Sequence, residues 1–143
     1  MTDDPTDHTT TEPNTEIVRR VLAHITAAEY DRLAELVTED LVFELPYAAA
    51  PIPNEFHGRA TWDAMQRGTF AMFDSFRNEP TAIYETGDPD VVIAEYQSDA
   101  VVKRNGRPYR NRYVGIFRFR DGRICAWREY HNPEATKVIR EPA

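Results

Sequence analysis

Apolar residues recur at helical spacing in the first half of the chain and at strand spacing in the second half. From Asn14, a favourable N-cap residue, one apolar stripe comprises Ile17, Val18, Val21, Leu22 and Ile25. The same spacing predicts a short helix over 31–37 and a longer one over 61–76. The longer helix would present a broad apolar surface made of Trp62, Met65, Phe70, Met72, Phe73 and Phe76.

Strand signals fill most of the remaining sequence. A short apolar run over 41–45 ends at Pro46, and residues 47–58 have the Pro- and Ala-rich composition of a loop. Four further strands are predicted over 79–86, 91–103, 107–120 and 123–131, separated by the turns Gly87-Asp88-Pro89-Asp90, Asn105-Gly106 and Asp121-Gly122. Helices followed by an antiparallel meander predict an α+β domain.

Alternation along the strands assigns residues to the two faces of the sheet. One face would hold Val92, Ala94, Tyr96, Ser98 and Ala100, together with Tyr109, Asn111, Tyr113, Gly115, Phe117 and Phe119. The other face carries Glu95, Asp99 and a series of arginines, so we expect cross-strand ion pairs there. In the last strand, Cys125, Trp127, Glu129 and His131 share one side, and if Trp127 faces the interior, Glu129 and His131 do as well.

The inner face predicted in this way carries more polar groups than a dry core requires. Because each buried polar group needs a partner, we expect a cavity that holds a polar ligand or water. Glu129 is the leading candidate for an acid or base, since burial beside aromatic surface raises the pKa of a carboxyl towards neutrality. The alternative is a carboxylate that pairs with Arg112 or Arg128 at the end of the strand.

Length and charge suit one acidic domain. The chain has 143 residues and a net charge of −7. We expect residues 1–13 to be a disordered acidic tail, residues 14–135 to form the domain, and residues 136–143 to be a C-terminal tail. Residues 103–128 hold nine Lys or Arg against one Asp, mostly at alternate strand positions, which favours cross-strand pairing over nucleic-acid binding.

Several functional classes lack their sequence signatures. There is no long apolar run and no secretory signal pattern, so we expect no membrane association and a cytoplasmic location. The single cysteine, Cys125, excludes an intramolecular disulfide and a thiolate cluster. Four scattered histidines without ligand spacing and the lack of a Gly-rich phosphate loop lead us to expect no metal and no cofactor.

Two stretches and the order of helices resemble a known family. They are Phe56-His57-Gly58-Arg59-Ala60 and the closing Asp121-Gly122-Arg123-Ile124 with Trp127-Arg128-Glu129-Tyr130 and Asn132-Pro133. Over residues 14–135 the chain resembles the SnoaL-like branch of the nuclear transport factor two-like superfamily. The resemblance implies a cone-shaped, curved antiparallel or mixed sheet wrapped around three N-terminal helices, a cystatin-like roll. It also implies a small-molecule pocket and a homodimer.

The resemblance is more specific for the fold than for the reaction. Members include polyketide cyclases, ketosteroid isomerases, limonene epoxide hydrolases and phenazine-biosynthesis proteins. Glu129 falls where the epoxide hydrolases have an acid/base aspartate and where the phenazine-type proteins have a glutamate. The hydrolases also need an arginine and an aspartate where this chain has Tyr96 and Ser98, and the phenazine-type proteins need a histidine where it has Met65. Neither of these two reactions is therefore implied.

Two functional hypotheses remain open. The first is an acid/base enzyme of the isomerase, cyclase or hydratase/hydrolase type, acting on an apolar oxygenated small molecule. Its catalytic residues would be Glu129, Tyr96, Asn111 and His131, and its substrate-binding residues Trp127, Phe117, Tyr113, Trp62, Tyr47 and His57. The second is a non-catalytic small-molecule-binding or dimeric interaction module.

Overall fold

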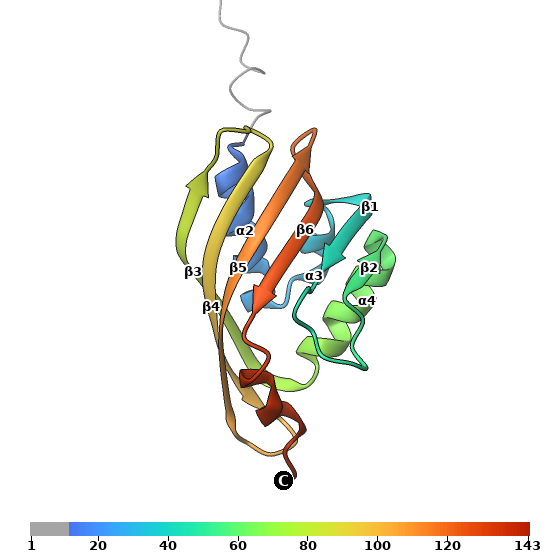
Figure 1. Cartoon of the computed structure of the whole chain (residues 1–143), viewed down its shortest axis with the longest axis vertical. Coiled ribbons are helices and arrows are strands. Elements are labelled where there is room, and N and C mark those ends of the chain that lie inside the picture. The colour runs from blue at the N-terminus through green and yellow to red at the C-terminus, as the bar shows by residue number, and fades with distance from the viewer. Residues whose placement is uncertain (1–11) are drawn as a thin grey trace, which may run out of the picture.

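The computed structural model describes residues 12–143. Its helices are α2 (Asn14–Ala27), α3 (Tyr30–Ala34), α4 (Arg59–Phe70) and the short 3-10 helix η1 (Ala135–Arg140). Its strands are β1 (Val37–Glu44), β2 (Glu55–His57), β3 (Phe73–Glu85), β4 (Val91–Val102), β5 (Pro108–Arg120) and β6 (Arg123–His131) (Figure 1). Except for Glu12 and Pro13, the predicted acidic tail lies outside the described residues.

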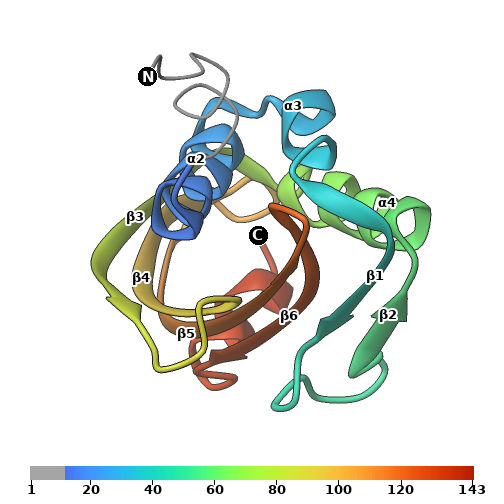
Figure 2. The same cartoon turned by 90° about the horizontal axis from the view of Figure 1, so that it is seen from above.

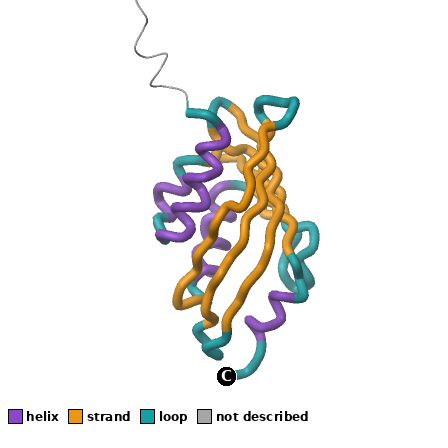
Figure 3. Tube along the Cα trace, turned by 90° about the vertical axis from the view of Figure 1, so that its left-hand side faces the viewer, coloured by secondary structure: helices purple, strands orange, loops and turns teal. Residues whose placement is uncertain are grey.

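The six strands form one curved sheet in the order β2-β1-β6-β5-β4-β3. All neighbours are antiparallel except β1 and β6, which run parallel. Seen from above, β3 to β6 form an arc around α2, with α3 and α4 along its open side (Figure 2). The three α-helices gather on one side of the sheet (Figure 3). The predicted α+β cone with a curved, mixed sheet is confirmed.

Helix α2 is held by the apolar stripe that predicted it. The stripe residues Ile17, Val18, Val21, Leu22 and Ile25 are all buried against the sheet. Asn14, predicted as the N-cap, is the first residue of the helix, and Pro13 occupies the N-cap position. Asn14 instead donates its side-chain amide to the backbone carbonyl of Pro89, at 3.0 Å, and so ties the start of α2 to the β3–β4 turn.

The face assignments in the two central strands are confirmed. In β4 every second residue from Val92 to Val102 is buried and those between are exposed or partly exposed, and β5 alternates in the same way from Tyr109 to Phe119. Cross-strand pairing matches these faces, because Tyr96 lies opposite Tyr113 and Ser98 opposite Asn111. The inner face of the sheet therefore carries the polar groups that the sequence placed there.

The predicted third helix was too long. It ends at Phe70, and Phe73 and Phe76 belong to β3, which starts six residues earlier than predicted. The strand pairing of β3 with β4 shifts between Phe73 and Ser75. One extra residue at such a bulge places side chains three positions apart on the same face of a strand, which imitates helical spacing.

Other boundaries also differ from the predictions. The second helix ends at Ala34, because Val37 begins β1 and pairs with Ile124 of β6. The segment predicted as a loop contains β2, which pairs with β1. Residues 135–140, assigned mostly to the tail, form η1, and Val138 and Ile139 pack against a small core that includes Phe73.

A second bulge corrects the face assignment in β6. The register between β5 and β6 shifts at Arg118 and Phe119, which leaves Cys125 without a paired residue. Ile124 and Trp127 are therefore both buried, although they were predicted on opposite faces. Over residues 12–143, no helix has the length and apolar character needed to span a membrane.

Candidate active site

Small residues on the inner face of the sheet open a space in front of Glu129. Glu129 on β6 pairs with Gly115 on β5, and Gly115 pairs with Ala94 on β4. A Cβ atom at Gly115 would lie 2.8 Å from the hydroxyl oxygen of Tyr96 and 2.7 Å from a ring carbon of Phe117. The Tyr96 ring therefore crosses β5 in the space that a side chain at position 115 would fill.

Two hydrogen bonds join the Tyr96 hydroxyl to Glu129 and Trp127. The Tyr96 hydroxyl donates to Oε2 of Glu129 at 2.5 Å, and Nε1 of Trp127 donates to the same hydroxyl oxygen at 3.2 Å. Tyr96 and Trp127 are 1% and 2% exposed, so both bonds lie away from bulk water. Because the indole can only donate, the hydroxyl proton of Tyr96 is directed at the carboxylate.

Burial shifts the proton affinities of this pair. Removal from water raises the pKa of Glu129 to about 7, and the hydrogen bond from Tyr96 opposes this rise. Burial, and then the adjacent Glu129 carboxylate, raise the pKa of Tyr96 well above its ordinary value. Tyr96 therefore keeps its proton near neutral pH, while Glu129 is present in both its charged and its neutral form.

Glu129 opens into a mostly apolar cavity of about 960 Å³ on the inner face of the sheet. Its walls come from β1, the loop before β2, α4, β3, β5, β6 and η1, and they include Phe43, Phe56, Met65, Phe70, Phe73, Phe76, Tyr109, Tyr113 and Trp127. Among the described residues, Glu129 is the one acidic side chain in this lining. An apolar wall around a single carboxyl is suited to proton transfer on a bound small molecule.

His131 lines the same cavity, two residues after Glu129 on β6. Partial burial lowers its pKa, so the imidazole is mainly neutral at pH 7. Its Nδ1 atom is buried and has no hydrogen-bond partner within residues 12–143. A neutral ring at this position can donate an N–H or accept a proton, depending on its tautomer.

A second hydrogen-bond network occupies Asn111. Its Nδ2 donates to the Tyr109 hydroxyl (2.7 Å) and to the carbonyl of Asn132 (3.0 Å), while its Oδ1 accepts from the backbone N–H groups of Arg112 and Asn132. Tyr113 links this network to Ser98 at 2.8 Å and to Tyr109 at 3.1 Å. The Asn111 amide has no donor left for a substrate oxygen, in contrast to the role predicted for it.

Four residues predicted to bind substrate lie away from the cavity. Trp62 and Phe117 are fully buried core residues that pack on Trp127, with ring centroids at 6.3 and 4.8 Å. Tyr47 is 58% exposed and lies edge-on to Tyr130. The His57 side chain is 68% exposed and contacts Glu55 at 2.9 Å. Of the six predicted substrate-binding residues, Trp127 and Tyr113 line the cavity.

Two cavity residues with unpaired polar atoms were missed at the sequence level. Gln66 is 4% exposed and its Nε2 has no partner among the described residues, and the same holds for Oδ1 of the buried Asn78. Gln66 lies four positions from both Trp62 and Phe70, so its place on the apolar stripe of α4 was a usable signal. For Asn78 the sequence gives no such signal, because its pattern predicts the strand only from residue 79 onwards.

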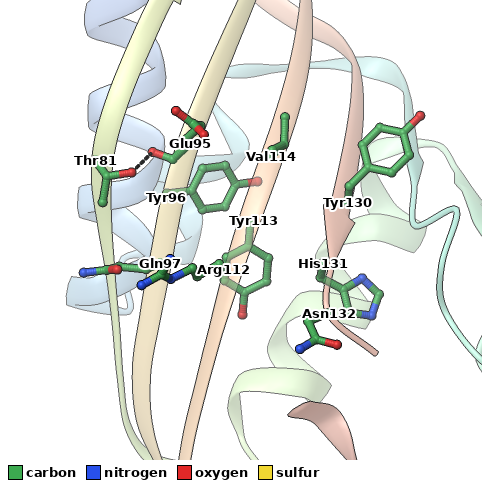
Figure 4. Close-up of a pocket in the computed structure, with 10 residues that line it drawn as sticks. All are labelled: Thr81, Glu95, Tyr96, Gln97, Arg112, Tyr113, Val114, Tyr130, His131 and Asn132. Atoms are coloured by element: carbon green, nitrogen blue, oxygen red, sulfur yellow. Dashed lines mark hydrogen bonds between the residues drawn. The ribbon is translucent and has the colours of Figure 1, made fainter. Parts of the chain in front are cut away.

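A second, shallower hollow of about 480 Å³ lies at the outer face of the sheet (Figure 4). Most of its lining comes from outward-facing positions, such as Glu95, Arg112 and Tyr130. It shares Tyr113 and His131 with the inner cavity, at the point where the pairing of β5 with β6 ends. Within residues 12–143, no three His, Cys, Asp or Glu side chains are grouped to hold a metal ion.

Comparison with known proteins shows the family of this chain. The sequence profile of the SnoaL-like domain matches residues 18–127, which is more than half of the chain. The chain belongs to the SnoaL-like family. Glu129 and His131 lie two and four residues beyond the segment of the SnoaL-like domain that the profile covers.

Relatives of this SnoaL-like protein include an uncharacterized protein, YesE, from Bacillus subtilis strain 168. It is 35% identical over 123 residues, which cover 85% of this chain and 83% of YesE. The solved structure of a candidate isomerase from Bacillus subtilis is 33% identical, with a TM-score of 0.78, and the match covers 87% of this chain and 89% of that one. IdmH, a candidate polyketide cyclase from Streptomyces antibioticus, shares the fold at 21% identity, with a TM-score of 0.75 over 90% of this chain and 98% of IdmH.

Proposed function

We propose that this protein is an acid/base enzyme that transfers a proton on an apolar, oxygenated small molecule, without a cofactor. The observation that carries the proposal is Glu129, whose pKa is raised to about 7 at the wall of an apolar cavity and whose carboxylate is held by Tyr96 at 2.5 Å. A carboxyl with a pKa near the working pH can both take up and return a proton. The similarity to a candidate isomerase supports the same reaction class.

In the proposed reaction, the ionised Glu129 removes a proton from a carbon atom next to a substrate carbonyl. The electron pair of the broken C–H bond moves to the carbonyl oxygen, and Glu129 becomes a neutral acid. The same acid then returns the proton to a different carbon of the conjugated system, which completes an isomerisation with no net loss or gain of atoms. The Tyr96 hydroxyl holds the Glu129 carboxylate by its hydrogen bond, and the raised pKa of Tyr96 keeps this hydroxyl protonated throughout the reaction.

The substrate oxygen needs a hydrogen-bond donor beside Glu129. We assign this role to His131, because successive inward positions of a strand lie about 6.6 Å apart, which leaves space for a carbonyl between the two side chains. A neutral imidazole donates its N–H to the developing oxyanion. The unpaired Nε2 of Gln66 supplies a further donor for an oxygen substituent on the apolar body of the substrate, and the unpaired Oδ1 of Asn78 supplies an acceptor for a hydroxyl group.

The proposal is tested with the E129Q variant. Wild-type protein and variant would be incubated with a panel of β,γ-unsaturated cyclic ketones, with turnover followed by the ultraviolet absorbance of the conjugated product. We expect the wild-type rate to rise with pH through about 7 as Glu129 ionises, and to fall by roughly 100-fold or more in E129Q.

The outer face of the sheet offers a matched control. Tyr84 donates to Oε1 of Glu95 at 2.7 Å, which repeats the tyrosine–carboxylate pair on an exposed surface. The E95Q variant should keep the wild-type rate. Equal turnover by E129Q and the wild type would refute the assigned mechanism. Tight ligand binding without turnover in either protein would favour the alternative, a non-catalytic binding module.

A further inference from the structure

The cavity that contains Glu129 ends in a group of three basic side chains. Lys103 and Arg104 follow the end of β4, and Arg140 is the last residue of η1; all three line the same cavity as Glu129. Within residues 12–143, none of the three forms an ion pair. Three unpaired cations at one end of an apolar cavity favour an anionic ligand group there.

The acidic residues nearest in sequence to this group are already paired. Glu134 contacts Lys137 at 2.8 Å, and Glu141 contacts Arg107. Glu134, Lys137 and Glu141 belong to the C-terminal segment that carries Arg140, and Arg107 lies at the end of the β4–β5 turn. Asp99, four residues before Lys103, contacts Arg110 at 3.5 Å. The surplus of positive charge at the end of the cavity is therefore not neutralised by its own surroundings.

The basic end of the cavity is held in place by the fold. Nδ2 of Asn105, in the β4–β5 turn, donates to the carbonyls of Val138 (2.8 Å) and Glu141 (3.0 Å). Val138 and Ile139 also pack against the small core that includes Phe73. Figure 1 shows η1 beside this turn, below the end of β6. Lys103, Arg104 and Arg140 thus belong to one anchored structure rather than to a free tail.

The distance from Glu129 to the basic end sets the shape of a ligand that spans both. Along β5 the inward positions run from Gly115, opposite Glu129, through Tyr113 and Asn111 to Tyr109, and the six residue-to-residue steps from 115 to 109 span about 20 Å. The cavity continues beyond Tyr109 to Lys103. A ligand that reaches both ends of the cavity is therefore elongated.

The charges also fix the direction in which such a ligand lies. Phe73, Phe76 and Ile139 line the stretch between the two ends, so this stretch accepts an apolar body. Glu129 in its ionised form repels a second carboxylate in an apolar setting, whereas the basic end attracts one. The head group therefore lies at Lys103, Arg104 and Arg140, with the body directed towards Glu129.

We propose that the cavity binds an elongated apolar carboxylate, anchored at its acidic head by Lys103, Arg104 and Arg140. This inference deepens the proposed function, on which it rests only for the reaction at the Glu129 end. The preference for a carboxylate itself requires no catalysis. The two ideas can therefore fail separately.

The test uses the full-length protein and two ligands that differ only in the head group. Dodecanoate and dodecan-1-ol would each compete with Nile red, a neutral fluorescent apolar probe, at low ionic strength. We expect dodecanoate to displace the probe at a concentration at least ten-fold lower than the alcohol, and this ratio should shrink as salt is added. In K103Q/R104Q/R140Q the ratio should fall to about one, with the alcohol unaffected.

A matched control removes the same charge from the opposite face. The R110Q/R112Q/R118Q variant loses three arginines from the outer face of β5 and should keep the preference for dodecanoate. E129Q should keep it too, which separates this test from that of the mechanism. Equal displacement by both ligands, no displacement by dodecanoate, or a preference that survives in K103Q/R104Q/R140Q would each overturn the inference.

Discussion

Gly115 shapes the site by the side chain it lacks. The residue is in an extended strand, so its importance comes from close packing rather than from an unusual backbone angle. Tyr96 uses the vacant space to bring its hydroxyl to Glu129, two strands away. The carboxylate would otherwise face the apolar cavity without a hydrogen-bond donor from β4.

We expect G115A to disrupt the Tyr96–Glu129 pair. The added methyl group would lie 2.8 Å from the Tyr96 hydroxyl, so the ring must move. Loss of the hydrogen bond should raise the pKa of Glu129 above about 7, because that bond lowers it, and should cost about 1–3 kcal/mol of stability. The pKa can be followed by carbon NMR of labelled glutamate, and stability by urea denaturation.

Gly68 provides the control for this substitution. It lies within α4, and no atom comes within 4 Å of a Cβ built there. G68A should therefore leave the pKa of Glu129 unchanged and stabilise the helix by about 0.5–1 kcal/mol. An unshifted Glu129 pKa in G115A would show that Tyr96 reaches the carboxylate without needing the gap.

At the scale of elements, the errors in the sequence predictions have a common origin. Phe73 and Phe76 are three positions apart and suggested a helix, yet a bulge puts both on the inner face of β3. A bulge in β6 does the same for Ile124 and Trp127. Bulges depend on the partner strand, so the pattern within one segment cannot reveal them. The turns and the faces of β4 and β5, which depend on local sequence, were predicted correctly.

The site was predictable to the extent that it follows strand alternation. Alternation placed Tyr96, Glu129 and His131 on the inner face, and the structure confirms this placement; their chemical roles stay predictions. The contributions of Gly115 and Asn78 depend on contacts between strands that are distant in sequence. Asn111 was predicted on the correct face of the sheet, but its side-chain amide is already hydrogen-bonded to Tyr109 and Asn132. Strand alternation gives the face of a residue and not its hydrogen-bond partners.

The link between the β4–β5 turn and η1 gives a prediction at this scale. N105A removes both side-chain hydrogen bonds to the backbone of the C-terminal segment, and we expect a loss of about 1–2 kcal/mol. Amide hydrogen exchange should accelerate across 136–141 while α2 stays protected. N14A, which removes one exposed bond at the other end of the molecule, should leave that segment unchanged. Unaltered exchange over 136–141 in N105A would contradict the anchoring role.

For the molecule as a whole, the charged groups of the outer face of the sheet differ in their partners from Glu129 on the inner face. The predicted ion pairs of the basic stretch occur on the exterior, where Arg110 lies 3.5 Å from Asp99 and Arg118 lies 3.6 Å from Asp88. Arg120 likewise bonds Asp40. Glu95, predicted to pair with an arginine, accepts from Tyr84 instead. Exposed pairs of this kind contribute little to stability, so the Glu129 carboxyl at the cavity wall matters more for the pH response.

We expect Glu129 to make the folded protein less stable as the pH rises. Its pKa increases from 4.5 to about 7 on folding, so the folded state binds the proton more tightly than the unfolded state. The stabilisation from the protonated form is complete below pH 4.5 and is lost as the pH rises through about 7. The full loss is roughly 3 kcal/mol.

The comparison of E129Q with the wild type by urea denaturation from pH 4.5 to 8.5 tests this expectation. The amide cannot ionise, so E129Q should lack this part of the pH dependence. Its free energy of unfolding relative to the wild type should therefore be higher above pH 7 than at pH 4.5. E95Q, which removes an exposed carboxylate, should follow the wild-type profile. Parallel profiles for E129Q and the wild type would mean that Glu129 has an ordinary pKa in the folded protein.

The hydrogen bond from Trp127 to Tyr96 also gives the molecule an intrinsic optical reporter. The indole N–H of Trp127 donates to the Tyr96 hydroxyl oxygen, and that hydroxyl donates its own proton to Glu129. The charge of the Glu129 carboxyl therefore acts on the excited state of Trp127 at short range. The only other tryptophan, Trp62, is buried and lies 6.3 Å from Trp127, measured between ring centroids. We therefore expect the emission of Trp127 to change in wavelength and intensity as Glu129 ionises, without any added label.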